Sequence, residues 1–367
     1  MATNFNFEKQ REQSAIKTGI VTKYFDAWAA ILSNRFPKLG YIDLYSGPGI
    51  YDDGSESTPI LILRRVIASP SLRNKFVFYL NNKDPENCYK LRQNISQLDG
   101  ISSLQFNPLI SNEEITYETP PKFNFPKIPC FCFLDPAGYN GLSLNLLEVF
   151  GKDFGTDLIF FFNYNDINRA LSNPKVAINM EQLFGRKHYY LLIDKIKNQS
   201  GQNRESIIVN EMSEALHDIG LRYTLPFRFK FEKKERTSHY IIFASKNITG
   251  FNIMKEIMVK IGETDYNGIG QFEFIPSCDK SSSIQLSIID LFNIPFETFK
   301  DNLCKRYFGK TYTMKSLYNT DSPNTRFISR QYKQALIELE LEGRITCDKP
   351  YAKRRKNTFS DNTVINF

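Results

Sequence analysis

The stretch from Tyr41 to Tyr51, YIDLYSGPGIY, decides the expected fold of this chain. Its first half is apolar and β-favouring, so it predicts a strand over 41–45, and the glycines that follow predict a tight turn into the next element. A glycine can take a positive φ and lets a ligand approach the backbone, because no Cβ stands in the way. Asp43 lies at the end of the predicted strand, where it could order the loop or face a positively charged ligand.

The spacing of Gly47 and Gly49 separates this loop from two kinds of phosphate-binding loop. A dinucleotide fingerprint would require a third glycine where the chain has Asp52, and a Walker loop would require Gly-Lys followed by Ser or Thr. An acid, three residues and then two glycines one residue apart instead suit S-adenosylmethionine, which carries a sulfonium and no phosphate. A plain tight turn that binds nothing is the alternative.

A ligand in this loop would need a second contact after the next strand, where an acidic side chain usually binds ribose hydroxyls. The sequence there is YLNNKD, so Asn82 takes that place and Asp84 follows two residues later. An amide can hydrogen-bond a diol, but without the strength of a charged acceptor. We predict Asn82 as the ribose contact, with Asp84 as its substitute.

A third segment, FLDPAGY at 133–139, follows another strand-like run. Asp135 and Pro136 at a strand end are similar to the acid-Pro-Pro-aromatic loop of amino-group methyltransferases, in which a carboxylate and a prolyl carbonyl accept hydrogen bonds from the target amine and an aromatic ring stacks on a flipped base. Tyr139 would be that ring, although Ala-Gly replaces the second proline and the aromatic lies one residue farther along. A simple Asp-Pro turn is the alternative.

The fold class follows from alternating apolar runs and helical patterns. Continuous apolar runs predict strands covered on both faces, and their alternation with helices predicts a parallel α/β sheet. The predicted strands lie at 41–45, 75–80, 104–110, 130–135, 156–162 and near 240. We expect a Rossmann-like, doubly wound α/β domain over residues 1–280, with a polar helical insertion over about 166–235.

The last part of the chain, 284–367, has a different pattern. Three helical segments and a strand, basic turn and strand are typical of a winged-helix domain, with Gly343 ending the third helix. The helix over 324–342 would enter a DNA major groove and the basic turn would contact phosphates. The residues expected to bind nucleic acid are Arg330, Lys333, Lys353, Arg354, Arg355 and Lys356.

Composition excludes several other classes of protein. The chain has 367 residues, a net charge of +7, three histidines and no apolar run long enough to cross a membrane. Its N-terminus lacks the apolar core of a signal peptide, so we expect a cytoplasmic protein. Of its six cysteines only Cys130 and Cys132 are close, and we expect two buried thiols rather than metal ligands, and no metal site.

In this order, several segments resemble the three-Cys-motif partner protein family. They are AIKTGIVTKYFDAWAAIL, YIDLYSGPGIYDDG with STPILILRRV, FLDPAGYNGLSLNLL, FNYNDINRAL and HYIIFASKNITG. The resemblance covers residues 10–260 and implies a class I methyltransferase-like fold that binds S-adenosylmethionine, a bacterial origin with phage or mobile-element links, and a radical-type partner protein that carries the three cysteines. Members of that family commonly have an acid where this chain has Asn82.

Two functions from different classes remain open on this sequence. The first is an S-adenosylmethionine-dependent methyltransferase that acts on nucleic acid, with DNA expected before RNA. The second is a nucleic-acid-binding partner of the radical-type protein whose methyltransferase fold has lost its chemistry, as the amide at Asn82 and the irregular Asp135 loop would predict.

Overall fold

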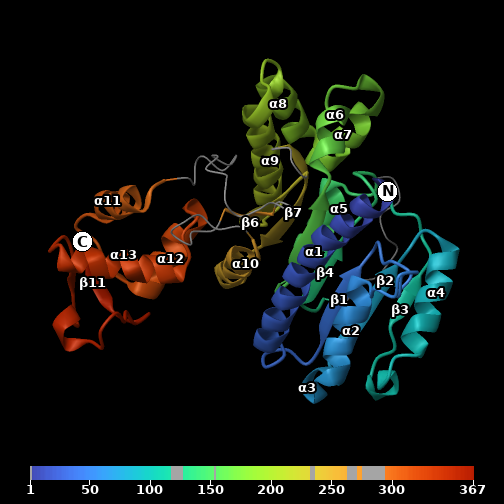
Figure 1. Ribbon diagram of the computed structural model, residues 1–367, viewed down its shortest axis with the longest axis horizontal. Helices are drawn as coiled ribbons and strands as arrows, with labels where there is room; N and C mark the ends of the chain where they lie inside the picture. Colours follow the sequence, from blue (N-terminus) through green and yellow to red (C-terminus); the bar gives the residue numbers. More distant parts are fainter. Residues whose placement is uncertain (1, 117–126, 153, 232–235, 263–270, 275–293) are drawn as a thin grey trace. The chain divides into compact units, whose positions relative to one another are not determined.

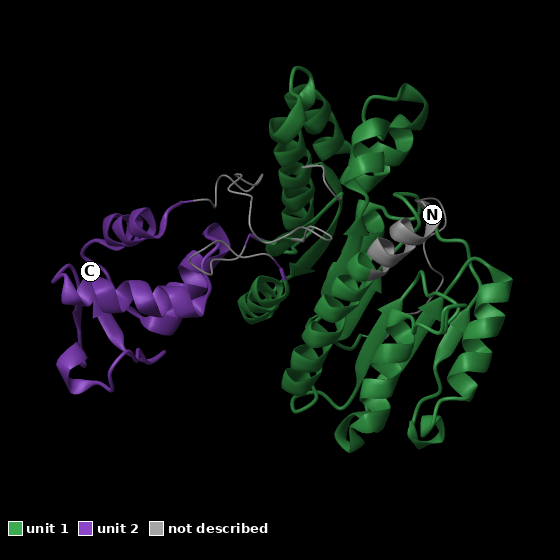
Figure 2. Ribbon diagram, viewed as in Figure 1, with its two compact units in different colours: residues 1–261, 272–279 green, residues 262–271, 280–367 purple. Residues whose placement is uncertain are grey.

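The computed structural model describes residues 2–116, 127–152, 154–231, 236–262, 271–274 and 294–367. The chain divides into two compact units (Figure 2): unit 1 comprises residues 1–261 and 272–279, and unit 2 comprises residues 262–271 and 280–367. In the part of the chain described here, no helix has the length and apolar character that crossing a membrane requires. The same residues contain no cluster of three His, Cys, Asp or Glu side chains that could hold a metal ion.

Unit 1 is built on an eight-stranded sheet with the order β3-β2-β1-β4-β5-β7-β6-β8. The strands are β1 (Leu39–Asp43), β2 (Phe76–Asn81), β3 (Leu109–Ser111), β4 (Cys130–Leu134), β5 (Asp157–Phe162), β6 (Tyr223–Lys230), β7 (Thr237–Ser245) and β8 (Glu273–Phe274). The pairings among β1 to β5 are parallel, whereas β7 runs antiparallel to both β5 and β6. This confirms the predicted doubly wound α/β fold, with β7 reversed between β5 and β6.

Helices cover both faces of this sheet (Figure 1). Those of unit 1 are α1 (Ala2–Leu32), α2 (Thr58–Ala68), α3 (Pro70–Arg73), α4 (Pro85–Ser96), α5 (Leu144–Gly151), α6 (Tyr164–Ala170), α7 (Ala177–Phe184), α8 (Arg186–Ile196), α9 (Gly201–Asp218) and α10 (Ile248–Ile261). Neighbouring strand residues point to opposite faces, so Tyr41 packs on Phe25 of α1 while Ile42 joins the core that contains Leu146 and Leu147 of α5. Every residue of β1 and β4 is buried, as the continuous apolar runs predicted.

The face under α1 is an aromatic cluster. Tyr24, Phe25 and Trp28 lie 5.7–6.0 Å from the ring of Phe131 in β4, measured between ring centroids. Tyr41 of β1 is 6.0 Å from the same ring. Phe131 is therefore the centre of the packing between α1 and the sheet. On the opposite face, Cys130 and Cys132 are both buried, as predicted.

Four helices, α6 to α9, occupy the chain between β5 and β6. The predicted insertion of 166–235 extended too far, because residues 223–230 form β6, an internal strand of the sheet. Its Arg228 and Lys230 are buried beside Glu205 and Glu273, and these charges concealed an otherwise apolar strand. The expected strand at 104–110 is shorter and later than predicted, since β3 comprises only Leu109–Ser111.

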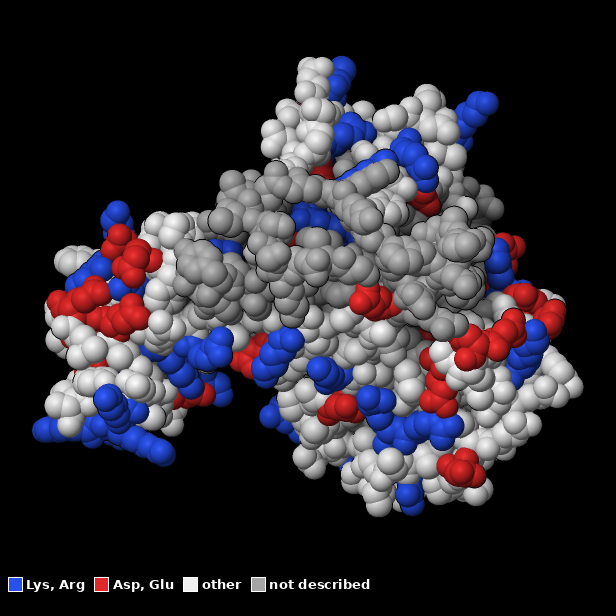
Figure 3. Space-filling model, viewed as in Figure 1, with Lys and Arg blue, Asp and Glu red and all other residues white. Residues whose placement is uncertain are grey.

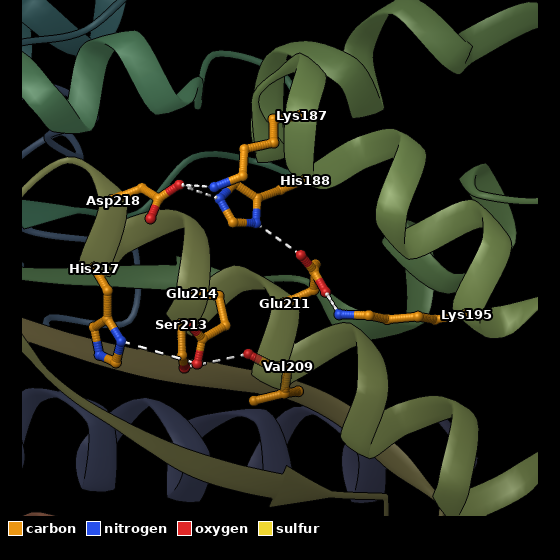
Figure 4. A network of polar contacts seen from close by, with 9 residues as sticks. All are labelled: Lys187, His188, Lys195, Val209, Glu211, Ser213, Glu214, His217 and Asp218. Atoms are coloured by element: carbon orange, nitrogen blue, oxygen red, sulfur yellow. Dashed lines mark hydrogen bonds and ion pairs between the residues drawn. The ribbon is translucent and has the colours of Figure 1, made fainter.

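A polar network joins α8 to α9 (Figure 4). The buried ring of His188 lies 2.7 Å from Glu211 through Nδ1 and 2.9 Å from Asp218 through Nε2. Lys195 donates to Glu211 at 2.6 Å, and Lys187 pairs with Asp218. Burial raises the pKa of Glu211, but hydrogen bonds from Lys195 and His188 outweigh it and leave the pKa lowered. The network therefore ties the two helices together and stabilises the insertion.

The described residues of unit 2 form three α-helices and a three-stranded antiparallel sheet. The helices are α11 (Phe296–Tyr307), α12 (Met314–Asp321) and α13 (Ser329–Leu341), and the strands β9 (Thr311–Thr313), β10 (Thr346–Cys347) and β11 (Val364–Asn366) are arranged in the order β10-β11-β9. The three predicted helices and the hairpin are present, and β9 adds a strand that the sequence did not reveal. Gly343 has a φ of +70°, which fits its expected role in ending the third helix.

Candidate functional site

The candidate site lies where the strand order reverses. β1 is followed in the sheet by β2 on one side, and β4 by β5 on the other, so the loops after β1 and β4 leave the carboxyl edge in opposite directions. Ligands of open α/β sheets bind in the crevice that this divergence creates. β1 ends at Asp43 and β4 is followed by Asp135, so the structure brings the two predicted acids to adjacent strand ends.

Asp43 orders the loop that follows it. Its side chain is 2% exposed, and its Oδ1 accepts a hydrogen bond from the Tyr45 backbone N–H at 3.0 Å. The Ser46 hydroxyl donates to the Asp43 carbonyl at 3.0 Å. Burial raises the pKa of Asp43 to about 7, the Tyr45 amide opposes this, and the charge of Asp135 adds to it. Of the two roles expected for Asp43, the geometry supports the ordering of the loop.

The two glycines of this loop have different surroundings. Gly49 has a φ of +97°, and a Cβ placed there would come within 3.0 Å of Asn94 Cβ in α4. Asn94 also donates to the carbonyl of Pro48 at 2.9 Å, so this side of the loop is fixed to α4. A Cβ at Gly47 would lie 2.6 Å from the hydroxyl of Tyr51, which covers that position.

Asn82 and Asp84 are both engaged in local structure. The Asn82 amide donates to the Ser46 carbonyl and its oxygen accepts from the Asp84 backbone N–H at 2.8 Å, so it fastens the loop after β1 to the end of β2. Asp84 caps α4 by accepting from the Glu86 N–H at 2.9 Å. Asp84 is exposed, and its second carboxylate oxygen receives only a 3.4 Å contact from Asn87. Of the two predicted ribose contacts, Asp84 has the more accessible acceptor.

The loop after β4 holds the three predicted catalytic residues. Asp135 is partly exposed, with a quarter of its side-chain surface accessible, whereas Pro136 is buried. Tyr139 is half-buried and packs against the core of unit 1, so its ring is not a free stacking surface in this conformation. The Tyr45 hydroxyl donates to the Gly141 carbonyl at 2.6 Å and thereby joins the loops on the two sides of the crevice.

Two side chains that the sequence did not reveal, Lys17 and Tyr51, complete the site. Lys17 of α1 donates a hydrogen bond to Asp135 Oδ2. Burial is the main cause that raises the pKa of Tyr51, and the charges of Asp135 and Asp43 raise it further. The signal for Lys17 was present, because it lies at helical spacing from the buried residues Val21, Tyr24 and Trp28. A lysine on the buried face of a helix is a candidate for an internal ion pair.

The basic residues predicted to bind nucleic acid divide into two groups. Arg354 is not a surface residue: 7% of its side chain is exposed, it pairs with Glu340 of α13, and its guanidinium lies 4.4 Å from the ring centroid of Phe359. Lys333 pairs with Asp361 at 2.7 Å. The predicted residues that are exposed are Arg330, Lys353, Arg355 and Lys356. Figure 3 shows Lys and Arg gathered at the end of unit 2 that holds the β10–β11 loop.

No family model and no curated protein sequence matches this chain. It is similar to several solved structures. One is a protein from Legionella pneumophila, with 12% identity and a TM-score of 0.38 over 66% of this chain and 91% of that one. A second is a putative methyltransferase from Thermoplasma acidophilum, with 12% identity and a TM-score of 0.29 over 57% and 69%. A third is the N-terminal domain of human METTL16 in complex with SAH, with 10% identity and a TM-score of 0.31 over 62% and 70%. TM-scores this low carry no functional argument.

Proposed function

We propose that this chain is an S-adenosylmethionine-dependent methyltransferase that acts on nucleic acid, with DNA as the first substrate to test. One observation carries the proposal: two carboxylates, Asp43 and Asp135, end adjacent strands at the reversal point of the sheet, beside a loop that requires glycine at Gly49. The resemblance to the three-Cys-motif partner family, with its phage or mobile-element setting, supports the same conclusion and stays a prediction.

In this proposal, some residues of the crevice bind the cofactor and others orient the acceptor amine. The backbone around Gly47 and Gly49 would hold the cofactor, and the exposed carboxylate of Asp84 would accept from its ribose hydroxyls. Access to Gly47 requires Tyr51 to swing outward, which its side chain can do because the residue is 46% exposed. When bound, S-adenosylmethionine supplies an electrophilic methyl group. Asp135 would accept a hydrogen bond from the acceptor amine and orient its lone pair, so no histidine base is needed.

Cofactor binding can be tested with a pair of glycine variants. Gly49→Ala should reduce binding of S-adenosylhomocysteine by about tenfold or more, because the new methyl group strains a positive-φ residue and collides with Asn94. Gly54→Ala is the matched control: its φ is +81°, yet nothing lies within 4 Å of the new Cβ. Titration calorimetry measures both. Equal affinity in the two variants would remove the Gly49 turn from the cofactor site.

The alternative is a nucleic-acid-binding partner of a radical-type protein, without methyl transfer. Two contacts favour it: the Tyr51 hydroxyl covers Gly47, and the Lys17 ammonium is already bound to Asp135. The same calorimetry separates the two functions. Absence of binding by wild-type protein at millimolar S-adenosylmethionine or S-adenosylhomocysteine would contradict the enzyme and support the binding partner.

We further propose that unit 2 is a winged-helix module that holds the duplex. Its support is the exposed set of basic residues on the β10–β11 loop and on α13, in a chain with a net charge of +7. Arg354 is excluded from this role, because it anchors the loop to α13 through Glu340. Arg330 would lie on the helix that enters the major groove.

Neutralising the exposed loop should weaken binding to duplex DNA in a salt-dependent way. Arg355→Ala with Lys356→Ala should reduce the slope of log K against log salt by about 1.8, since each phosphate contact contributes about 0.9. Lys305→Ala with Lys310→Ala is the matched control, because both lysines are exposed elsewhere in unit 2. Fluorescence anisotropy over a range of salt concentrations measures the slopes. An unchanged slope in the loop variant would show that the loop does not contact phosphates.

A further inference from the structure

Lys17 reaches the centre of the candidate site from an element far away in sequence. It lies on α1, and its ammonium binds Asp135 Oδ2, 118 residues further along the chain. Only 18% of the Lys17 side chain and 25% of the Asp135 side chain are exposed. The Lys17 ammonium also lies 5.6 Å from the ring centroid of Phe161 in β5. The pair is therefore partly removed from water and held in one place by α1, β4 and β5.

Three titratable side chains, all from β1 and the loop after it, interact electrostatically with the Lys17–Asp135 pair. Asp43 ends β1, and burial is the main cause that raises its pKa, while the charge of Asp135 raises it further and the charge of Lys17 lowers it. The Tyr41 hydroxyl donates to Asp43 Oδ2 at 3.5 Å, and its pKa is raised by burial and by the charges of Asp43 and Asp135. The pKa of the Tyr51 hydroxyl is raised by burial and then by the charges of Asp135 and Asp43. Lys17 thus contacts Asp135 directly and acts on Asp43 only through its charge.

His239 of β7 does not supply a second positive charge. Its ring is 9% exposed and stacks on Phe229 at 4.5 Å between centroids. Burial, with the nearby charge of Lys17, lowers the pKa of His239 to about 3. The ring is therefore neutral at physiological pH, and the balance at the ends of β1 and β4 depends on Lys17.

We propose that Lys17 is a positioning residue of this site, which fixes the Asp135 carboxylate at the crevice beside the buried Asp43. The inference deepens the proposed methyl transfer, since it rests on Asp135 as the group that contacts the acceptor. Without Lys17 the Asp135 carboxylate would lose the ion pair that holds it at the end of β4. A displaced carboxylate would no longer lie where the acceptor amine needs a hydrogen-bond acceptor.

The titration of Asp43 tests this role without any cofactor or substrate. Lys17→Met removes the charge and keeps the length of the side chain, so the pKa of Asp43 should rise above its value of about 7. Asp135→Asn should lower it, and the double variant should lie between the two single variants because the two opposing charges are both gone. Lys17→Arg, which keeps the charge, is the matched control. Carbon-13 NMR of labelled aspartate measures each midpoint, and Lys17→Gln provides a second neutral variant.

The pH profile of methyl transfer is the second readout. In Lys17→Met the acid limb should move to higher pH, and Lys17→Arg should restore it. An unchanged Asp43 midpoint in both neutral variants would overturn the role of Lys17. Suppose instead that the Asp43 midpoint shifts in the Lys17 variants but the wild-type protein transfers no methyl group. That result would overturn the proposed function and leave the charge coupling between Lys17 and Asp43 standing, so the two failures are distinguishable.

Discussion

Replacing Asp135 by asparagine should reduce methyl transfer by about 10²–10³-fold while cofactor affinity stays close to wild type. Asparagine keeps the shape of the side chain, and its carbonyl can still accept a hydrogen bond from Lys17, so the loop after β4 should keep its place. What is lost is the negative charge that attracts and orients the acceptor amine. The reduction should therefore appear in kcat, because the interaction strengthens as positive charge develops on the attacking nitrogen.

Single-turnover transfer from labelled cofactor to DNA measures this effect, with calorimetry on the same samples. Asp52→Asn is a suitable control, because Asp52 is an exposed carboxylate in the loop after β1 and has no part in the proposed chemistry. Activity equal to wild type in Asp135→Asn would remove Asp135 from the mechanism. Loss of cofactor affinity together with activity would mean that the carboxylate holds the loop rather than the acceptor.

The sequence predicted the fold because the sheet is built from local signals. The runs that form β1, β2, β4 and β5 are apolar without interruption, and such runs are strands buried on both faces. β6 was missed for the opposite reason: its buried Arg228 and Lys230 look like surface residues until Glu205 and Glu273 are brought beside them. Only the assembled sheet provides those partners.

The candidate site shows the same division between local and distant causes. The positions of Asp43, Gly49 and Asp135 were predictable, since Asp43 ends β1 and the other two lie in the loops that follow β1 and β4. The pairing of Arg354 with Glu340 was not, and neither was that of Lys17 with Asp135, because each depends on how separate elements pack. A basic or acidic residue that the sequence pattern predicts as a ligand contact can thus form an ion pair within the chain instead.

The largest expected change in stability comes from Phe131→Ala, which should lower the free energy of unfolding of unit 1 by about 3–5 kcal/mol. The Phe131 side chain is fully buried and lies within 6.0 Å of the rings of Tyr24, Phe25, Trp28 and Tyr41. Alanine removes the hydrophobic contribution of the ring and leaves a cavity that the surrounding rings, fixed on α1 and β1, cannot close. Phe131→Leu should cost less, since it fills most of that space.

Trp28 makes this prediction directly measurable. It is the only tryptophan of the chain and part of the same cluster, so its fluorescence during denaturant unfolding follows unit 1 rather than unit 2. Phe154→Ala is the matched control: the side chain is 73% exposed, and its loss should cost less than about 1 kcal/mol. A comparably small loss in Phe131→Ala would mean that α1 is not docked through this ring. Because α1 also carries Lys17, undocking would release the ion pair at Asp135, so the stability of the aromatic cluster and the geometry of the candidate site are expected to fail together.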